Sequence, residues 1–133
     1  MTRIFLDTNI LISATFWEGS SHKILINISK KIVLGFTTKQ ILDEYRRILK
    51  RDFNHSEEEA DNRVKKLLEV LIIVSPKGSI DFVKADPSDN RVVEGAAEAN
   101  ADFILSYDRH LLDLKMFRGI TIVKPETFLK NRE

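Results

Sequence analysis

The sequence predicts an α/β fold in which a mainly parallel sheet of about five strands is covered by helices on both faces. Short apolar runs typical of buried strands alternate along the chain with longer stretches of helical periodicity. A length of 133 residues suits one domain, 1–133, with its own core, and is too short for two ordinary domains. No internal repeat or low-complexity segment interrupts this order.

Five apolar runs have the length and composition of buried strands. They are rich in Ile, Val, Leu and Phe, and a proline follows the third and the fifth within two residues. The expected strands cover residues 3–6, 31–36, 72–74, 103–106 and 120–123.

The intervening stretches carry helix signals. Ser20 or Ser21 is the expected cap of the second helix, Ser56 precedes an acidic first turn in the fourth, and Asp86 with Pro87 suits the start of the fifth. The third is strongly amphipathic. The expected helices cover residues 10–15, 21–28, 37–49, 56–71, 86–100 and 109–114.

Composition narrows the class of protein. Hydrophobic residues make up 43% of the chain and charged residues 31%, as in globular proteins that fold in water. Cysteine is absent, which excludes disulfides and thiolate metal sites and agrees with a reducing compartment. Asp7 interrupts the first apolar run, so no signal peptide is expected, and the run 67–74 is too short to span a bilayer. We therefore expect a cytoplasmic protein without membrane association.

Two acids stand at the ends of expected strands. Asp7 directly follows the run 3–6, and Asp108 follows the run 103–106 after one residue. Because ligands of open α/β sheets bind at the carboxyl ends of the strands, these acids are candidates for one shared site. The alternative is that each Asp only caps the helix that follows it.

Two further acids can reach the same edge of the sheet. Glu44 lies about 100° from the centre of the apolar face of its helix, whereas Asp43 points almost directly away from that face. The alternative role for Glu44 is an ion pair within its own helix. Asp89 shares a helix face with apolar residues that are expected to be buried against the sheet. It is free to act in a site if Asp86 caps the helix.

The ordered set of motifs resembles the PIN domain family, whose members are mostly metal-dependent ribonucleases and include the toxins of VapBC-type toxin–antitoxin pairs. The resemblance covers nearly the whole chain and is closest to small, stand-alone, toxin-like PIN proteins. The segment 106–108 matches the family pattern of Thr or Ser, one residue, then Asn or Asp, although the bulky Tyr107 in the middle could change access to the cleft. The segments that carry the resemblance are Leu6-Asp7-Thr8-Asn9, Glu44, the segment from Asp86 to Asn90, and Ser106-Tyr107-Asp108.

The resemblance implies a three-layer α/β/α fold in which acids surround one or two Mg²⁺ or Mn²⁺ ions and RNA phosphodiester bonds are hydrolysed. Hard divalent cations prefer oxygen ligands, and four clustered carboxylates would repel one another without a cation. The implied catalytic residues and metal ligands are Asp7, Glu44, Asp89 and Asp108. Supporting hydrogen bonds are expected from Thr8 or Asn9 and from Ser106.

An acidic site needs basic groups beside it to bind a polyanion. The net charge of +1 excludes a globally basic protein but allows a local basic surface. Phosphate contacts from such a surface would be largely independent of sequence; the alternative is an ordinary solvated helix face. Phe16 and Trp17 could stack bases or contact a partner. The candidate RNA-binding residues are Arg46, Arg47, Lys50, Arg51 and Arg109.

The function implied by the resemblance is that of a metal-dependent endoribonuclease, the toxin of a toxin–antitoxin pair. Its partners would be an RNA substrate, an antitoxin protein and, as in many relatives, a second copy in a homodimer. A non-catalytic PIN-like module that binds RNA or a protein is the alternative. A phosphotransferase of the haloacid dehalogenase type needs a second Asp where this chain has Asn9, and a receiver domain needs a phosphoacceptor Asp where it has Ser75-Pro76.

Overall fold

The computed structural model describes residues 1–77 and 87–131, with side chains from residue 90 onward in the second range. The sequence Lys77-Gly78-Ser79 is typical of a loop, and the second and third of these residues lie outside the described ranges. The strands are β1 (Arg3–Leu6), β2 (Leu34–Thr38), β3 (Ile72–Val74), β4 (Phe103–Leu105), β5 (Met116–Phe117) and β6 (Ile120–Val123). The helices are α1 (Thr8–Phe16), α2 (Ser20–Ser29), α3 (Lys39–Asp52), α4 (Glu57–Leu68), α5 (Pro87–Glu98), α6 (Arg109–Leu114) and α7 (Pro125–Lys130).

The strands form one sheet in the order β3-β2-β1-β4-β6-β5, which confirms the predicted α/β fold. All neighbours pair in parallel except β5 and β6. The first strand is central, because β1 pairs with β2 on one side and with β4 on the other. Asp7 and the segment after β4 are therefore brought to the same edge of the sheet, as the sequence predicted.

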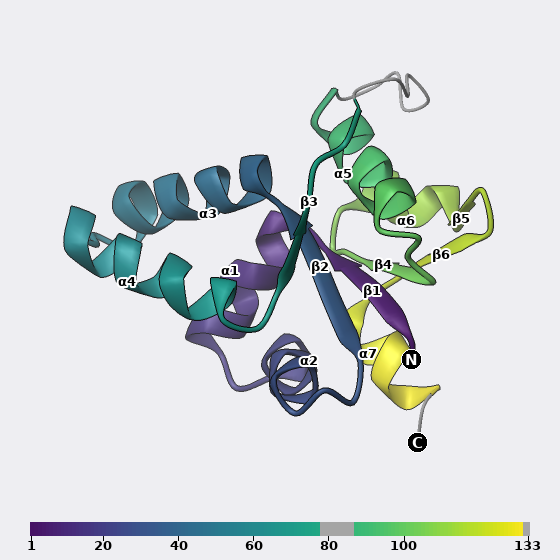
Figure 1. The fold of residues 1–133 in the computed structure, drawn as a ribbon, viewed down its shortest axis with the longest axis horizontal. Coiled ribbons are helices and arrows are strands. Elements are labelled where there is room, and N and C mark those ends of the chain that lie inside the picture. The colour runs from purple at the N-terminus through teal and green to yellow at the C-terminus, as the bar shows by residue number, and fades with distance from the viewer. Residues whose placement is uncertain (78–86, 132–133) are drawn as a thin grey trace.

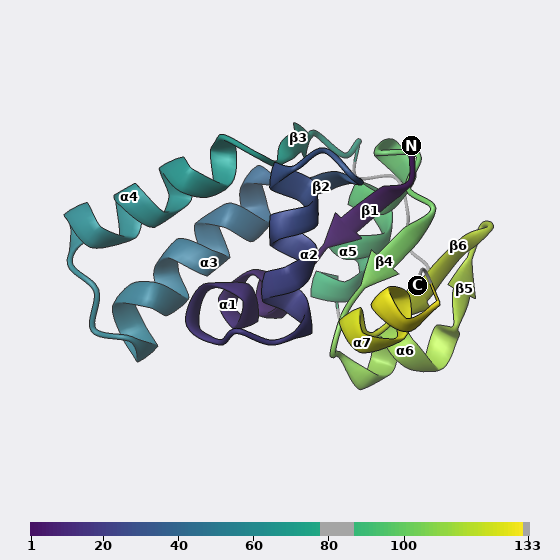
Figure 2. The same cartoon turned by 90° about the horizontal axis from the view of Figure 1, so that it is seen from below.

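Helices lie on both sides of the sheet. In Figure 1, α1 and α2 lie on one side of β1 and β2, and α5 lies on the other. The helices α3 and α4 run side by side and project away from the sheet in both views (Figures 1 and 2). Within residues 1–77 and 87–131, no helix has the length and apolar character needed to cross a membrane.

The sheet and α5 approach each other closely at Gly95. A Cβ at this position would lie 2.4 Å from the ring of Phe5 in β1 and 3.0 Å from the methyl group of Thr38 in β2. Val92, Val93 and the rest of the same helix face are buried against the sheet. This contact fixes the position of α5 beside the carboxyl ends of β1 and β2.

The second strand begins and ends later than the sequence predicted. α2 extends to Ser29, and Lys31 adopts a left-handed backbone with φ of 60°, so the turn occupies the first residues of the expected strand. At the other end, Thr37 and Thr38 belong to the strand. Thr38 caps α3 by accepting a hydrogen bond from the Ile41 N–H at 3.1 Å, so the helix starts at Lys39, two residues later than predicted.

Other predicted ends need correction. Gly19 is the N-cap of α2 and supplies no side-chain hydrogen bond, so the prediction that Ser20 or Ser21 caps this helix was wrong. α4 begins with a capping box between Ser56 and Glu59, as expected, but ends at Leu68 rather than at residue 71. The strand β5 and the helix α7 were not predicted. The expected cap of α5 at position 86 lies outside the described residues.

Candidate active site

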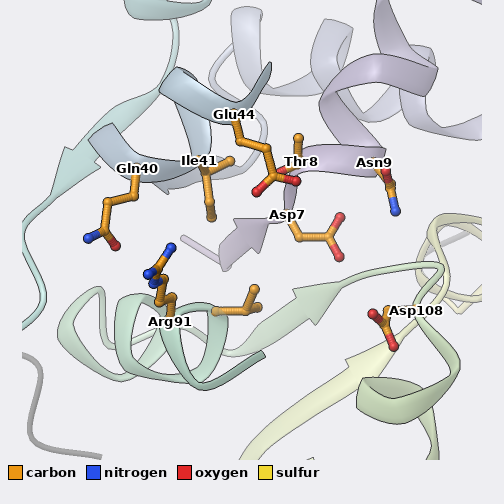
Figure 3. A pocket seen from close by; sticks show the side chains of 9 residues that line it. Asp7, Thr8, Asn9, Gln40, Ile41, Glu44, Arg91 and Asp108 are labelled. Carbon is orange, nitrogen blue, oxygen red and sulfur yellow. The ribbon is translucent and has the colours of Figure 1, made fainter. Parts of the chain in front are cut away.

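A cavity of about 80 Å³ opens where α1, α3 and α5 meet the loop that follows β4 (Figure 3). A volume of this size admits several water molecules, so it can take a small hydrated ion. Three carboxylates and one guanidinium are among the side chains that surround it. The lining residues are Asp7, Thr8, Asn9, Gln40, Ile41, Glu44, Arg91, Val92 and Asp108.

Asp7 is buried, with 6% of its surface exposed, and both of its carboxylate oxygens accept hydrogen bonds. Oδ1 accepts from the backbone N–H of Ile10 at 3.2 Å, which makes Asp7 the N-cap of α1. Oδ2 accepts from the hydroxyl of Ser106 at 2.5 Å. Capping a helix and lining the cavity were alternative roles in the sequence, and one side chain has both.

The environment of Asp7 favours its neutral form. The pKa of this carboxyl is raised from 3.8 to about 6, chiefly because the group is buried and also because the negative charges of Asp108 and Glu44 lie nearby. The hydrogen bonds from Ser106 and Ile10 act in the opposite direction. Asp108 and Glu44 are thus near enough for their negative charges to repel that of ionised Asp7. A cation bound among the three carboxylates would offset this repulsion.

Ser106 connects the two strand-end acids. It is fully buried, and besides donating to Asp7 its Oγ accepts the backbone N–H of Asp108 at 3.0 Å. Asp108 in turn caps α6, because its Oδ1 accepts from the N–H of His110 at 2.8 Å. The loop after β4 therefore holds both acids in a fixed relation through one hydroxyl group.

Glu44 comes from α3 and is half-buried at the cavity. Figure 3 shows its carboxylate directed toward Asp7, with Asp108 on the other side of Asp7. Asp43 lies on the exposed side of the same helix and pairs with Lys39 at 3.3 Å, in agreement with its predicted position. Periodicity thus distinguished the acid at the cavity from the acid in solvent.

Of the other predicted site residues, two line the cavity and the side chain of the third is not described. Thr8 is buried at the cavity and Asn9 is exposed at it. Asp89 lies in the first turn of α5, and its side chain is outside the described part of the chain. The structure therefore brings together three of the four predicted acids.

The donors suit a hard divalent cation, although they are not arranged around one. Among the described residues, no group of three His, Asp or Glu side chains is already placed to hold a metal ion. The chemistry of the donors nevertheless fits Mg²⁺ or Mn²⁺, because all three acids at the cavity provide oxygen and Mg²⁺ keeps several waters when bound to few carboxylates. Coordination of one ion by all three acids would therefore require their side chains to move.

The basic residues of α3 do not form one continuous free surface. Arg46 and Lys50 both pair with Glu57 of α4, and Arg46 also pairs with Asp61 at 2.6 Å. Arg51 pairs with its neighbour Asp52 at 2.8 Å. The other two candidates, Arg47 and Arg109, are exposed.

The aromatic residues at the C-terminal end of α1 lie away from the cavity. Asp7 precedes the first turn of α1, whereas Phe16 is the last residue of this helix and Trp17 is its C-cap. The ring of Phe16 stacks on Phe53 with centroids 4.0 Å apart, while Trp17 is 57% exposed.

Tyr107 connects the loop after β4 to two helices. Its hydroxyl donates to the carboxylate of Glu126 in α7 at 2.6 Å and lies 3.5 Å from the hydroxyl oxygen of Ser21 in α2. The bulky side chain thus contacts the helices rather than replacing a small residue inside the cavity.

Two cavity residues were missed in the sequence. Gln40 precedes Glu44 by four residues and so shares its helix face, which was an available signal. Arg91 belongs to no recognised motif. No motif or spacing indicated that the guanidinium of this residue would line the cavity.

Comparisons with known proteins agree with this architecture. A family model described as PIN domain matches residues 3–110. The fold is similar to a chain in the crystal structure of VapBC2 from Rickettsia felis bound to a DNA fragment from its promoter, with a TM-score of 0.65 and 15% sequence identity. That similarity covers 91% of this chain and 97% of the other. No curated protein shows a significant sequence match.

Proposed function

The chain belongs to the PIN domain family, and from this premise we propose that it is a metal-dependent endoribonuclease and the toxin of a toxin–antitoxin pair. The observation that carries the proposal is the meeting of Asp7, Glu44 and Asp108 at one cavity, from three separate elements. Their mutual repulsion is unfavourable unless a cation is bound, which points to a role beyond stability.

The acids would hold one or two Mg²⁺ or Mn²⁺ ions, with Asp89 as the fourth ligand. A divalent cation bound there would supply the charge that activates water and stabilises the phosphoryl oxygens during hydrolysis. Ser106 fixes the orientation of the Asp7 carboxylate by donating to Oδ2, which leaves the other lone pair of that oxygen for a ligand. With a pKa of about 6, Asp7 is mostly ionised at neutral pH and so is ready to bind a cation.

RNA would be held by cations outside the carboxylate cluster. Arg47 and Arg109 are exposed and are the simplest candidates for phosphate contacts. Arg46, Lys50 and Arg51 already pair with carboxylates, so their use by RNA would require exchange of those partners. Binding should weaken with added salt, because phosphate contacts release counterions.

The direct test is cleavage of a mixed RNA pool in the presence of Mn²⁺ or Mg²⁺. The wild-type protein should cleave, chelation by EDTA should stop cleavage, and Asp7→Asn should reduce it by about 100-fold or more, since a ligand to the ion loses its charge. Asp43→Asn is the matched control, because this acid lies on the exposed side of the Glu44 helix. Equal cleavage by wild type and Asp7→Asn would refute the proposed nuclease site.

A non-catalytic binding module is the second candidate. It is favoured by the fact that both oxygens of Asp7 already accept hydrogen bonds, so the residue has a complete structural role without metal. Calorimetry with Mn²⁺ detects ion binding, and the RNA assay then separates an enzyme from a module that holds a structural ion.

The toxin role has its own test. The structural neighbour is a VapBC2 complex bound to DNA, and we extend to this chain the idea of an antitoxin partner. Expression should arrest bacterial growth, and co-expression of an antitoxin encoded beside the gene should restore it. Expression of Asp7→Asn should leave growth unaffected. A homodimer remains a prediction, which sedimentation of the purified protein can test.

A further inference from the structure

The cavity contains hydrogen-bond donors as well as carboxylates. Figure 3 shows the guanidinium of Arg91 and the amide of Gln40 at one end, Asp108 at the other, and Asp7 and Glu44 between them. The two ends therefore suit opposite charges: the carboxylates attract a cation, and the guanidinium and amide attract an anion.

Arg91 is not occupied by the neighbouring acids. Among the residues whose side chains are described, no ion pair or hydrogen bond joins its guanidinium to Asp7, Glu44 or Asp108. Lys50 of α3, by contrast, pairs with Glu57. Within the part of the chain whose side chains are described, the Arg91 guanidinium therefore lines an acidic cavity without pairing to its acids, which suits it to an external anion.

The position of Arg91 is determined by the packing of its helix. The next two residues, Val92 and Val93, are buried, and one turn further Gly95 lies directly against the ring of Phe5. α5 therefore cannot turn or withdraw without losing this contact, so the backbone at Arg91 is held beside the cavity. The Arg91 side chain itself is exposed, which leaves its guanidinium accessible to an incoming group.

We propose that Arg91, assisted by Gln40, binds a phosphate of the RNA next to the one that is cleaved. The inference rests on the proposed nuclease function, whose scissile phosphate would lie over the carboxylates. A guanidinium can donate two parallel hydrogen bonds to a phosphate, and the Gln40 amide can donate a third without adding charge. The contact would set the register of the backbone and would not read base identity.

Binding of a labelled single-stranded RNA oligonucleotide tests this role directly. Fluorescence anisotropy in an Asp7→Asn background prevents cleavage, so affinity is measured at equilibrium over a series of salt concentrations. Adding Arg91→Gln should raise Kd by about tenfold, as expected for loss of a charge-assisted contact. It should also reduce the slope of log K against log salt by about 0.7, the value for one phosphate contact on a single strand.

Three matched variants define the interpretation. Arg118→Gln removes the same charge from the exposed turn between β5 and β6 and should change neither Kd nor slope. Arg91→Lys should keep the slope, because the charge remains. Gln40→Ala should weaken binding by about twofold to fivefold without changing the slope, because only a neutral hydrogen bond is lost.

The outcomes separate this inference from the nuclease proposal. If Arg91→Gln and Arg118→Gln bind RNA with the same Kd and slope, the phosphate contact is refuted, even if the wild-type protein cleaves RNA. If the wild-type protein cleaves nothing with Mn²⁺ or Mg²⁺ but Arg91→Gln lowers both affinity and slope, the contact stands and the nuclease function fails.

Discussion

At the scale of single residues, Asp7 combines two roles that usually belong to different side chains. It caps α1 and it lies in an acidic cavity, where burial raises its pKa to about 6. The cap could be predicted from its place between a strand and a helix. The raised pKa could not, because it depends first on the burial of the side chain in the folded protein and then on the charges of Asp108 and Glu44, which are distant in sequence.

The raised pKa of Asp7 predicts a pH-dependent difference in stability. A folded-state pKa above the unfolded value of 3.8 gives a stabilising contribution that is complete below pH 3.8 and is lost as pH rises through about 6. In EDTA, the free energy of unfolding of Asp7→Asn relative to wild type should therefore increase between pH 4 and pH 8. A shift from 3.8 to about 6 corresponds to about 3 kcal/mol. Urea unfolding across this range measures the change, and a difference that is the same at every pH would contradict it.

Two residues that line the cavity, Gln40 and Arg91, were not predicted from the sequence. Gln40 shares a face with Glu44 and could have been inferred from helical spacing. Arg91 could not, because its presence at the cavity depends on how closely α5 packs on the sheet. Asp89 stays a prediction, since its side chain lies outside the described residues.

At the scale of elements, the interiors of helices and strands were predictable, and their ends were less so. The start of β2 moved because Lys31 takes a left-handed conformation after α2, and no strong turn residue marked that position. β5 is only two residues long, too short to show a strand pattern. The start of α7 did carry a signal, since Pro125 occupies its first position and Glu126 its first turn.

The contact between α5 and the sheet predicts the effect of a small side chain at position 95. In Gly95→Ala the new methyl group would overlap the Phe5 ring, which should destabilise the protein by about 1–3 kcal/mol. The better helix propensity of Ala, about 1 kcal/mol, offsets part of this loss. Gly19→Ala is the comparison without steric overlap, because nothing lies within 4 Å of a Cβ there; since Gly19 is the N-cap of α2, a loss of about 1 kcal/mol or less is expected from the weaker cap alone. If chemical denaturation shows Gly95→Ala to be more stable than the wild type by about 1 kcal/mol, the gain from helix propensity alone, the close approach of α5 is wrong.

The link between Tyr107 and α7 predicts a local effect. Tyr107→Phe removes the hydrogen bond to Glu126 and should cost about 1 kcal/mol, the typical net value of one such bond. Because this bond joins α7 to the loop after β4, amide protons of α7 should exchange faster in the variant. Hydrogen exchange followed by NMR gives the readout. Unchanged protection of α7 would mean that its packing against α2 alone holds it in place.

At the scale of the whole molecule, the chain order of the elements explains why the site could be anticipated. A parallel sheet with β1 between β2 and β4 brings the residues after β1 and β4 together, and α3, which follows β2, brings Glu44 to the same edge. The convergence of three acids thus follows from topology. The distances between these carboxylates, and the presence of the Arg91 guanidinium beside them, depend on how the helices pack on the sheet. The sequence alone does not show this packing.

If these acids share a cation, the ion should stabilise the whole fold. Mn²⁺ at 100 times its Kd should add about 2.7 kcal/mol to the free energy of unfolding and raise the thermal midpoint. Asp7→Asn and Glu44→Gln should lose most of the rise, whereas Asp43→Asn should keep it. Thermal unfolding followed by circular dichroism measures the midpoints. An equal rise in the wild type and in Asp7→Asn would mean that the ion binds elsewhere.

The hydrogen bond between Asp7 and Ser106 spans 99 residues of chain, and this has a consequence during translation. A growing polypeptide exposes Asp7 long before the ribosome has added the hydroxyl that orients it and the carboxylate that faces it. During that interval the cavity lacks the side formed by the loop after β4. If the proposed nuclease function holds, an unfinished copy lacks Ser106 and Asp108 of its site for as long as its messenger is being read.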